Sequence, residues 1–263
     1  MLSFMIKALL PICVFIFGIF TSSCYVLAQT TYAVVVGISD YANFGPQNGD
    51  LHFADDDARL FAELLMSREG GSISPNNIIL LTERNATRAN ILRALSLFQQ
   101  ATSRDRVIFY FSGHGDQSYL LPYDARPGVV LFHNEVKKAF RQSAAQTKVL
   151  LADACKSGNI RRRTYTQAPS TTSSDVNKNV IVIMSSRANQ LSQELGRLRH
   201  GVFTYFLVRG AAKEADENRD RIVTMQELYK YMRQMIMRMT QNQQTPVVFG
   251  RFPASLPFTR LSQ

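Results

Sequence analysis

Short apolar runs separated by amphipathic segments are the feature that most restricts the fold of this chain. The runs, rich in β-branched residues and phenylalanine, cover residues 32–39, 77–82, 106–112, 148–154 and 179–186. Between them, residues 54–68 and 87–100 repeat apolar side chains at the three- and four-residue spacing of a helix. Continuous apolar strands that alternate with helices indicate a mainly parallel sheet covered on both faces. We therefore expect an α/β protein whose functional residues gather at the carboxyl ends of the strands.

The first 28 residues have the pattern of an export signal. One cation, Lys7, precedes the apolar run Ala8–Phe20, which is short for a membrane-spanning helix and typical of a signal peptide. Ala28 supplies a small residue before a cleavage point at Gln29. We expect an exported protein, periplasmic or secreted. An uncleaved membrane anchor is the alternative, and only that alternative would attach the protein to a membrane.

Cysteine usage singles out one thiol. Removing residues 1–28 from the 263 residues leaves 235, which is enough for one domain, residues 29–263, with a substantial core. Cys13 and Cys24 lie in the leader, so the remaining chain has Cys155 alone and forms no internal disulfide. An unpaired thiol in an oxidising compartment is either buried and inert or used chemically.

The chain is basic without a pattern that indicates nucleic-acid binding. Its net charge of +10 falls to +9 without the leader, because Lys7 is the only charged residue there. The cations are scattered, apart from one run of arginines, and no row of aromatic side chains accompanies them. We interpret the excess charge as a solvated surface and expect no nucleic-acid partner.

Two of the predicted strands end in reactive residues. FSGHGD carries Ser112 and His114, and LADACKSG carries Asp153 and Cys155. Side chains two apart on a strand share a face, so neighbouring strands would bring these four together at the carboxyl edge of the sheet. A nearby imidazolium stabilises a thiolate nucleophile, and the flanking glycines let backbone N–H groups approach a substrate carbonyl.

These motifs support a family resemblance. VIFYFSGHGD and VLLADACKSG resemble the histidine and cysteine motifs of caspase-like cysteine peptidases, and those of metacaspases and bacterial caspase-like proteins more than those of animal caspases. Residues 34–65 resemble the first strand and helix of the family, 185–210 the start of its small-subunit half and 244–258 its closing strand. The resemblance implies a caspase-like fold, with a mainly parallel six-stranded sheet sandwiched between helices.

The resemblance also implies a catalytic mechanism. Cys155 would be the nucleophile and His114 the general acid and base of an endopeptidase, with the backbone N–H groups of Gly115 and Cys155 as the oxyanion hole. Metacaspases commonly have a histidine directly after the cysteine, and this chain has Lys156 there. The change leaves the dyad intact, and a lysine beside a thiol can lower its pKa.

Substrate preference follows from the same resemblance. Asp57, Ser112 and Asp153 match the positions that line the acidic pocket of metacaspases, which selects Arg or Lys before the scissile bond. Animal caspases have Gln where this chain has Asp153, and they bind a substrate aspartate with arginines. Two carboxylates would pair with a cationic side chain and repel an anionic one. The expected partners are proteins or peptides with Arg or Lys before the cleaved bond, although Asp57 also suits the acidic first turn of a helix.

A long polar segment interrupts the alternation. Residues 157–178 are rich in Ser, Thr and Asn and lack an apolar period, which predicts an exposed linker between the large- and small-subunit-like halves. The run Arg161, Arg162 and Arg163 gives a basic-specific peptidase a site for self-processing. The alternative is that these arginines only keep the linker soluble.

A second pattern concerns metal binding. Asp216, Asn218, Asp220 and Glu227 stand at positions 1, 3, 5 and 12 of an EF-hand-like loop, but Arg221 replaces the glycine of position 6. We interpret the segment as a polar turn that caps a helix starting near Thr224. No cofactor is required by the chemistry, and Ca²⁺ is the one left open.

Two alternatives to this function remain. One is a histidine–cysteine peptidase of other specificity, such as a legumain-like enzyme, which would tolerate loss of Asp153. The other is a non-catalytic caspase-homology module for binding or regulation, for which His114 and Cys155 would have no use. The remaining histidines, His52, His133 and His200, are expected to be surface residues rather than catalysts.

Overall fold

The computed structural model describes residues 29–45, 49–116, 118–156, 180–187 and 189–261. The predicted leader, residues 1–28, and the predicted linker, residues 157–178 with its three arginines, lie outside the described residues. None of the helices in the described ranges is long and apolar enough to cross a membrane.

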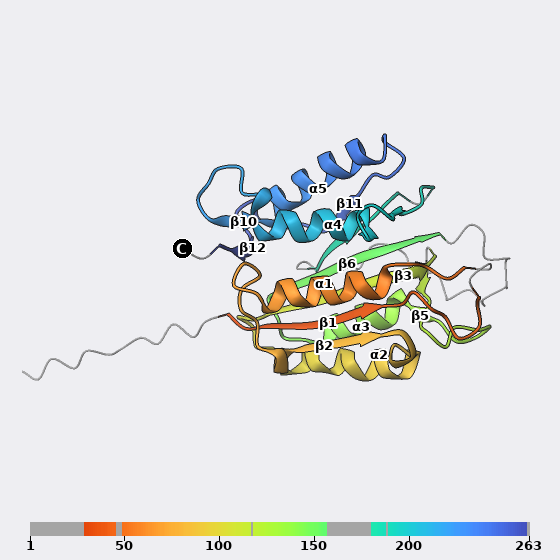
Figure 1. The fold of residues 1–263 in the computed structure, drawn as a ribbon. Helices are drawn as coiled ribbons and strands as arrows, with labels where there is room; N and C mark the ends of the chain where they lie inside the picture. The colour runs from red at the N-terminus through yellow and green to blue at the C-terminus, as the bar shows by residue number, and fades with distance from the viewer. Residues whose placement is uncertain (1–28, 46–48, 117, 157–179, 188, 262–263) are drawn as a thin grey trace, which may run out of the picture.

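A sheet of mostly parallel strands forms the centre of the molecule (Figure 1). Its main path has the order β11-β7-β6-β3-β1-β2, and only the β11–β7 pair is antiparallel. The two-residue strands β4 (Tyr119–Leu120) and β5 (Leu131–Phe132) extend it beyond β3. The strands of the main path are β1 (Thr31–Gly37), β2 (Ile78–Thr82), β3 (Arg106–Gly115), β6 (Thr147–Lys156), β7 (Val180–Met184) and β11 (Val247–Phe249). The predicted six-stranded, mainly parallel arrangement is confirmed, with β4 and β5 as additions.

The apolar runs explain why β3 and β6 occupy the middle of this path. Each strand is ten residues long, and they pair in parallel over their whole length, from Arg106 opposite Thr147 to Gly115 opposite Lys156. Residues 107–111 on β3 are all fully buried. A strand buried on both faces needs apolar side chains at every position, which is the pattern of the sequence.

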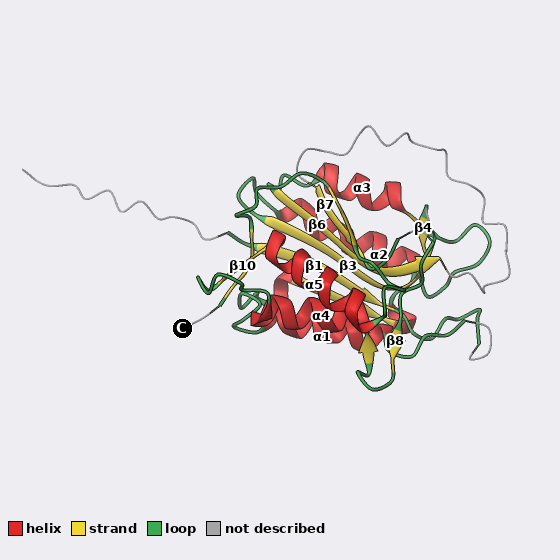
Figure 2. Ribbon diagram, turned by 90° about the horizontal axis from the view of Figure 1, so that it is seen from above, coloured by secondary structure: helices red, strands yellow, loops and turns green. Residues whose placement is uncertain are grey.

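Helices cover both faces of the sheet (Figure 2). On one face lie α1 (Ala54–Met66), α4 (Val202–Arg209) and α5 (Met225–Met239), which pack on a core that includes Ile108, Tyr110 and Leu151. On the other face lie α2 (Arg88–Ala94) and α3 (His133–Gln142), over a core that includes Phe109 and Phe111. Alternate residues of β3 therefore serve opposite cores, as the two-residue period of a strand requires.

Local signals fix where the helices begin. The Thr87 side chain accepts a hydrogen bond from the Asn90 N–H and so caps the start of α2. The helix predicted over 87–100 is α-helical only to Ala94 and continues as a 3₁₀ segment, Leu95–Gln100. Thr224 caps α5 in a reciprocal pair with Glu227, which agrees with the predicted capped helix.

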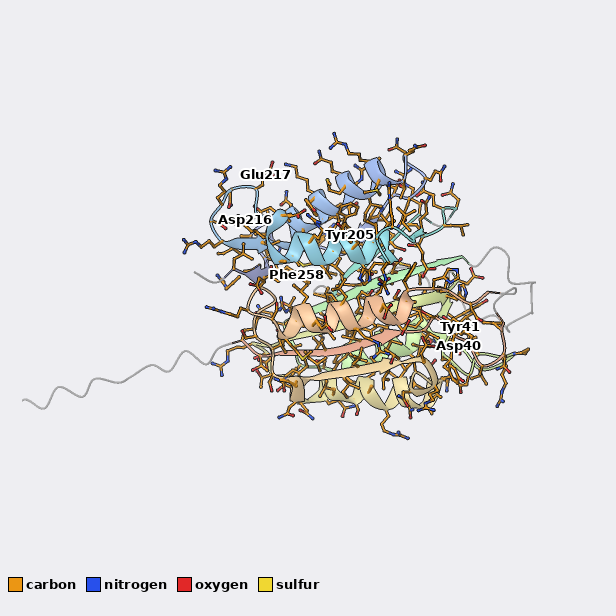
Figure 3. The ribbon with its side chains drawn as sticks, in the orientation of Figure 1. Asp40, Tyr41, Tyr205, Asp216, Glu217 and Phe258 are labelled. Carbon is orange, nitrogen blue, oxygen red and sulfur yellow. The ribbon has the colours of Figure 1, made fainter. Side chains whose placement is uncertain are left out.

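Two short antiparallel strand pairs lie outside the main sheet. The hairpin of β8 (Glu194–Leu195) and β9 (His200–Gly201) comes just before α4, and β10 (Ile222–Thr224) pairs with β12 (Pro257–Arg260) across α5 and β11. Figure 3 shows Tyr41 at the carboxyl end of β1 and Asp216 and Phe258 at the opposite end of the sheet. The two pairs therefore belong to different ends of the molecule, and only β8–β9 adjoins the edge where the reactive residues were predicted.

Candidate active site

His114 stands at the carboxyl end of β3, where a glycine and a tyrosine position it. The His114 N–H donates a hydrogen bond of 2.7 Å to the Tyr41 hydroxyl, and the Tyr41 ring stacks on the imidazole with centroids 5.1 Å apart. Gly113 has φ +155°, and a Cβ there would come within 2.7 Å of the same hydroxyl. Only glycine therefore allows Tyr41 to approach the backbone that carries His114.

The imidazole has a defined tautomer. Its Nε2 is hydrogen-bonded to the Gly49 carbonyl oxygen. A carbonyl only accepts hydrogen bonds, so Nε2 carries the proton and Nδ1 is left to exchange a proton with a reacting group. Burial lowers the pKa of His114, and the bond to Gly49 only partly opposes this, so the neutral, basic form predominates at neutral pH.

The sheet register brings Cys155 beside His114. β3 and β6 are neighbours, and His114 and Cys155 are register partners across them. The condition set by the sequence, that the strands ending in His114 and Cys155 be adjacent, is therefore met. Gly115 follows on β3 opposite Lys156, so the backbones of Gly115 and Cys155 stand one position apart on neighbouring strands.

Two residues before His114 and Cys155, the same two strands carry Ser112 and a buried carboxylate, Asp153. The register partner of Ser112 is Asp153, and both side chains are buried. Ser112 and Asp153 continue the face formed by Tyr110 and Leu151, so the apolar core under α1 and α4 ends in polar groups at this edge. The predicted pocket residues Ser112 and Asp153 thus lie at the polar end of one of the two cores.

Helix α1 supplies the second carboxylate, Asp57. Its side chain is 1% exposed and accepts hydrogen bonds from the Ser112 hydroxyl at 3.3 Å and from the Gly201 N–H, which lies 3.2 Å from each oxygen. The Nδ1 of His200 completes the set at 3.0 Å from Oδ1. The predicted pocket residues Asp57, Ser112 and Asp153 are therefore brought together by the fold.

Asp153 is held by hydroxyl groups. It accepts hydrogen bonds from Ser192 and, at 3.3 Å, from Thr204 on α4. Thr204 in turn bonds the Tyr110 hydroxyl at 2.6 Å, and the fully buried Gln244 donates to the Ser192 hydroxyl at 3.0 Å. Among the described residues, none of the ion pairs involves Asp153.

Gly201 lies beside both carboxylates, and its lack of a side chain leaves room for them. A Cβ at this position would lie 2.7 Å from Oδ2 of Asp57 and 2.7 Å from Oδ2 of Asp153. Both carboxylates thus face the same small volume. Burial raises the pKa of Asp57 to about 6 and that of Asp153 to about 7, and the charge of Asp57 contributes to the second shift. The two carboxyl groups therefore share a buried site in which the charged form of each is disfavoured.

The chain matches a family model described as Caspase domain over residues 30–255. The chain belongs to this caspase family. Its members are cysteine peptidases, in agreement with the histidine and cysteine that the register brings together. No curated protein matches the chain significantly.

Solved structures show that this caspase domain shares its fold with distant relatives. Protein GSU0716 from Geobacter sulfurreducens matches with a TM-score of 0.62 and 18% identity, covering 89% of this chain and 100% of that one. Caspase-1 from Spodoptera frugiperda matches with a TM-score of 0.62 and 12% identity, covering 89% and 91%. At these identities the similarity establishes the fold and leaves the specificity to be argued from the pocket.

The caspase fold adds site residues that the sequence analysis missed. His200, expected on the surface, instead bonds Asp57. His133, also expected there, is half-buried, and burial lowers its pKa to about 4. His52 is exposed as expected. Glu194 accepts hydrogen bonds from the N–H groups of His52 and Phe53 and so anchors β8 to the start of α1. The sequence feature that could have drawn attention to His200 is its position directly before Gly201, the residue at the start of α4.

The side chains of the EF-hand-like loop bond within the loop and to the start of α5. Asn218 and Asp220 bond each other, the Asp216 carboxylate accepts from the Arg221 N–H, and Glu227 bonds Thr224. Arg221 does adopt the left-handed φ of +67° that suits a glycine. No three acidic, histidine or cysteine residues of the described chain are grouped so that they could hold a metal ion.

Proposed function

We propose that this caspase domain is a cysteine endopeptidase that cleaves peptide bonds after Arg or Lys. The observation that carries the proposal is the convergence of Asp57 and Asp153 at Gly201, on the strand pair that brings His114 beside Cys155. A guanidinium or ammonium group that reaches the two carboxylates would exchange its hydration for two negative charges, whereas an aspartate side chain would meet only like charge.

The chemical steps follow from the groups at the sheet edge. His114 Nδ1 takes the thiol proton of Cys155, and the thiolate sulfur bonds to the substrate carbonyl carbon, whose oxygen becomes the oxyanion held by backbone N–H groups of Gly115 and Cys155. The imidazolium then gives its proton to the leaving amine as the C–N bond breaks. Water, deprotonated by His114, attacks the thioester, and the thiol leaves with the proton returned to it.

Two features support the proton transfers in particular. The Gly49 carbonyl fixes Nε2–H and so holds the imidazole in the tautomer that can accept a proton at Nδ1. Burial, which lowers the pKa of His114, keeps the imidazole neutral in the resting enzyme. Both favour general base catalysis at neutral pH.

Self-processing at Arg161, Arg162 and Arg163 is part of the proposal. These residues follow Cys155 closely in the sequence, and their side chains match the proposed preference for cations. Full-length protein would then convert into two fragments on incubation, and Cys155→Ala would stay intact. Replacing the three arginines with alanine would remove the fragments and leave cleavage of small peptides in place.

The decisive test uses the full-length chain, purified in a mild detergent because of its apolar leader. It is incubated with fluorogenic peptides that end in Arg, Lys, Asn or Asp, with and without Ca²⁺, beside Cys155→Ala. The proposal expects turnover of the Arg and Lys peptides alone, abolished in the variant. Turnover of the Asn peptide instead would indicate a legumain-like specificity, and no turnover under any condition would indicate a binding module.

A further inference from the structure

His200 is the residue of the acidic pocket that no catalytic step uses. It belongs to β9, and its Nδ1 lies 3.0 Å from Oδ1 of Asp57. The His200 side chain is 22% exposed and that of Asp57 is 1% exposed. The imidazole therefore covers the buried carboxylate from its solvent side, where a ligand would reach it.

Asp57 does not need His200 to hold its position. Its two oxygens already accept hydrogen bonds from the Gly201 N–H, and Oδ2 also accepts one from Ser112. The helix α1, buried on this face, fixes the backbone of Asp57. With these partners in place, Asp57 keeps its position when the His200 imidazole leaves, so another hydrogen-bond donor can replace the imidazole.

The charges around His200 favour its protonated form. The hydrogen bond to Asp57 is the main cause of the raised pKa of His200, the charge of Asp56 on α1 adds to it, and partial burial and Arg199 oppose it. From the other elements, β6 contributes Asp153, and β8 contributes Glu194, whose carboxylate is bonded to the backbone of His52 and Phe53. While both groups are charged, Asp57 therefore has a cation of the protein itself as its neighbour.

We propose that His200 is a specificity-determining residue, a resident cation on Asp57 that the Arg or Lys side chain of a substrate must displace. The inference rests on the proposed function, since it concerns the pocket that would select those side chains. Displacement costs most when the imidazole is charged and least when it is neutral. His200 therefore weakens the binding of basic substrates at acidic pH and leaves it nearly unchanged at alkaline pH.

A role in positioning predicts the opposite effect of substitution. If His200 held Asp57 in place, its loss would raise KM for basic peptides at every pH. If it competes with the substrate, its loss lowers KM, and the effect fades as the imidazole loses its proton. His200→Asn separates charge from hydrogen bonding, because its amide keeps an N–H donor near the Nδ1 position without a charge.

The kinetic test compares wild type, His200→Ala and His200→Asn on an Arg peptide at about pH 6.5, where Asp57 with its pKa of about 6 is still mainly charged, and at about pH 8.5, above the ordinary histidine pKa. His52→Asn is the matched control, because His52 is an exposed histidine outside the pocket. Both His200 variants should lower KM at the acidic pH by roughly fivefold, in line with the loss of one surface charge competitor, with kcat unchanged, and match wild type at the alkaline pH. An unchanged or raised KM in either variant at the acidic pH overturns the inference.

A second readout does not depend on turnover. The chain has four histidines, so the titration of the His200 ring can be followed by NMR in the Cys155→Ala chain and assigned with His200→Asn. Adding an uncleaved Arg peptide should move the His200 pKa back toward its ordinary value, because the imidazole leaves Asp57. A His200 titration that the peptide does not alter overturns the inference.

The two proposals fail in distinguishable ways. If wild type cleaves Arg and Lys peptides selectively while His200 variants show the wild-type KM, the proposed function is supported and the role of His200 as a competing cation is refuted. If wild type shows no preference for Arg or Lys, the proposed function falls, and the inference falls with it.

Discussion

Oδ2 of Asp57 and Oδ2 of Asp153 each lie 2.7 Å from the point that a Cβ on Gly201 would occupy. The two carboxylates come from α1 and β6, and the N–H of Gly201 bonds only Asp57. Because Gly201 on β9 has no side chain, the two carboxylates can both lie close to its backbone. Three consequences of this arrangement can be measured.

The first concerns Gly201→Ala. Gly201 has φ −60°, which alanine adopts without strain, so the only effect of the substitution is the collision of its methyl group with the two carboxylates. Overpacking of this kind costs about 1–3 kcal/mol. We expect KM for Arg and Lys peptides to rise by about tenfold or more, as the lower part of that range implies.

Gly196→Ala is the matched control for this experiment. Gly196 lies in the same β8–β9 hairpin, and no atom lies within 4 Å of a Cβ built there. Peptide cleavage by this variant should equal that of wild type. Equal kinetics for both glycine variants would mean that the carboxylates do not line the binding volume for the substrate cation.

The second consequence is a pH dependence of substrate binding. The pKa values of Asp57 and Asp153 are raised to about 6 and about 7, so both carboxyl groups gain protons as the pH falls through that range. A protonated pocket does not attract a cation, and KM for an Arg peptide should therefore rise as the pH falls from about 8 to about 5. The pKa of His114 is lowered, so kcat should fall only at a lower pH than the one at which KM begins to rise. Pre-steady-state and steady-state rates on one Arg peptide across this pH range would separate the pH dependence of KM from that of kcat. Parallel changes in kcat and KM would contradict the assignment of the KM change to the two carboxyl groups.

The third consequence links specificity to stability. Asp153 has a higher pKa in the folded chain than in the unfolded one, so the folded state binds the proton more tightly between pH 3.8 and about pH 7. By linkage, its contribution to the free energy of unfolding declines as the pH rises through that window and is lowest above it. Asp153→Asn removes this effect and should raise the stability of the unliganded protein at about pH 8 by roughly 2 kcal/mol.

Denaturant unfolding at about pH 8 and about pH 4 provides the measurement for Asp153→Asn, since the stability gain should vanish where wild-type Asp153 is protonated. The same variant should lose most of its preference for Arg and Lys peptides. A variant that is less stable than wild type at both pH values would show that the charged carboxylate is needed for folding.

Much of the fold was predictable because the chain carries redundant signals. Each central strand is a continuous apolar run, and the two strands that hold His114 and Cys155 are also the two longest. The sequence left their adjacency as a condition, and the family resemblance to the histidine and cysteine motifs allowed the dyad to be named before the register showed it. Asp57, Ser112 and Asp153 were also named in advance, because the family resemblance assigns those positions.

The missed residues share a different property. His200, Thr204 and Gln244 reach the pocket from segments that follow the linker, and nothing in a local sequence pattern shows which strand end they approach. Gly49 contributes only a backbone carbonyl, which any residue type could supply. Contacts of this kind depend on how loops close over the sheet, and they become visible only in the folded chain.

The positioning of His114 gives the last prediction. The Tyr41 side chain is buried, its hydroxyl accepts the His114 N–H at 2.7 Å and its ring stacks on the imidazole. Tyr41→Phe keeps the ring and removes the acceptor, so a buried N–H loses its partner, which costs about 1–3 kcal/mol. We expect kcat to fall by about tenfold, the equivalent of the lower part of that range, and KM for Arg peptides to stay the same, because the acidic pocket is untouched.

Tyr205→Phe is the control for Tyr41→Phe. The Tyr205 hydroxyl also accepts a hydrogen bond, from Arg209 at 2.7 Å, but this bond on α4 is exposed to solvent (Figure 3 labels Tyr205). Its loss should leave both kcat and KM unchanged. If Tyr41→Phe instead raised KM at constant kcat, Tyr41 would contribute to substrate binding rather than to the placement of the imidazole. Because the stacked ring remains in the variant, a loss confined to kcat would assign the effect to the single hydrogen bond that fixes the backbone of His114.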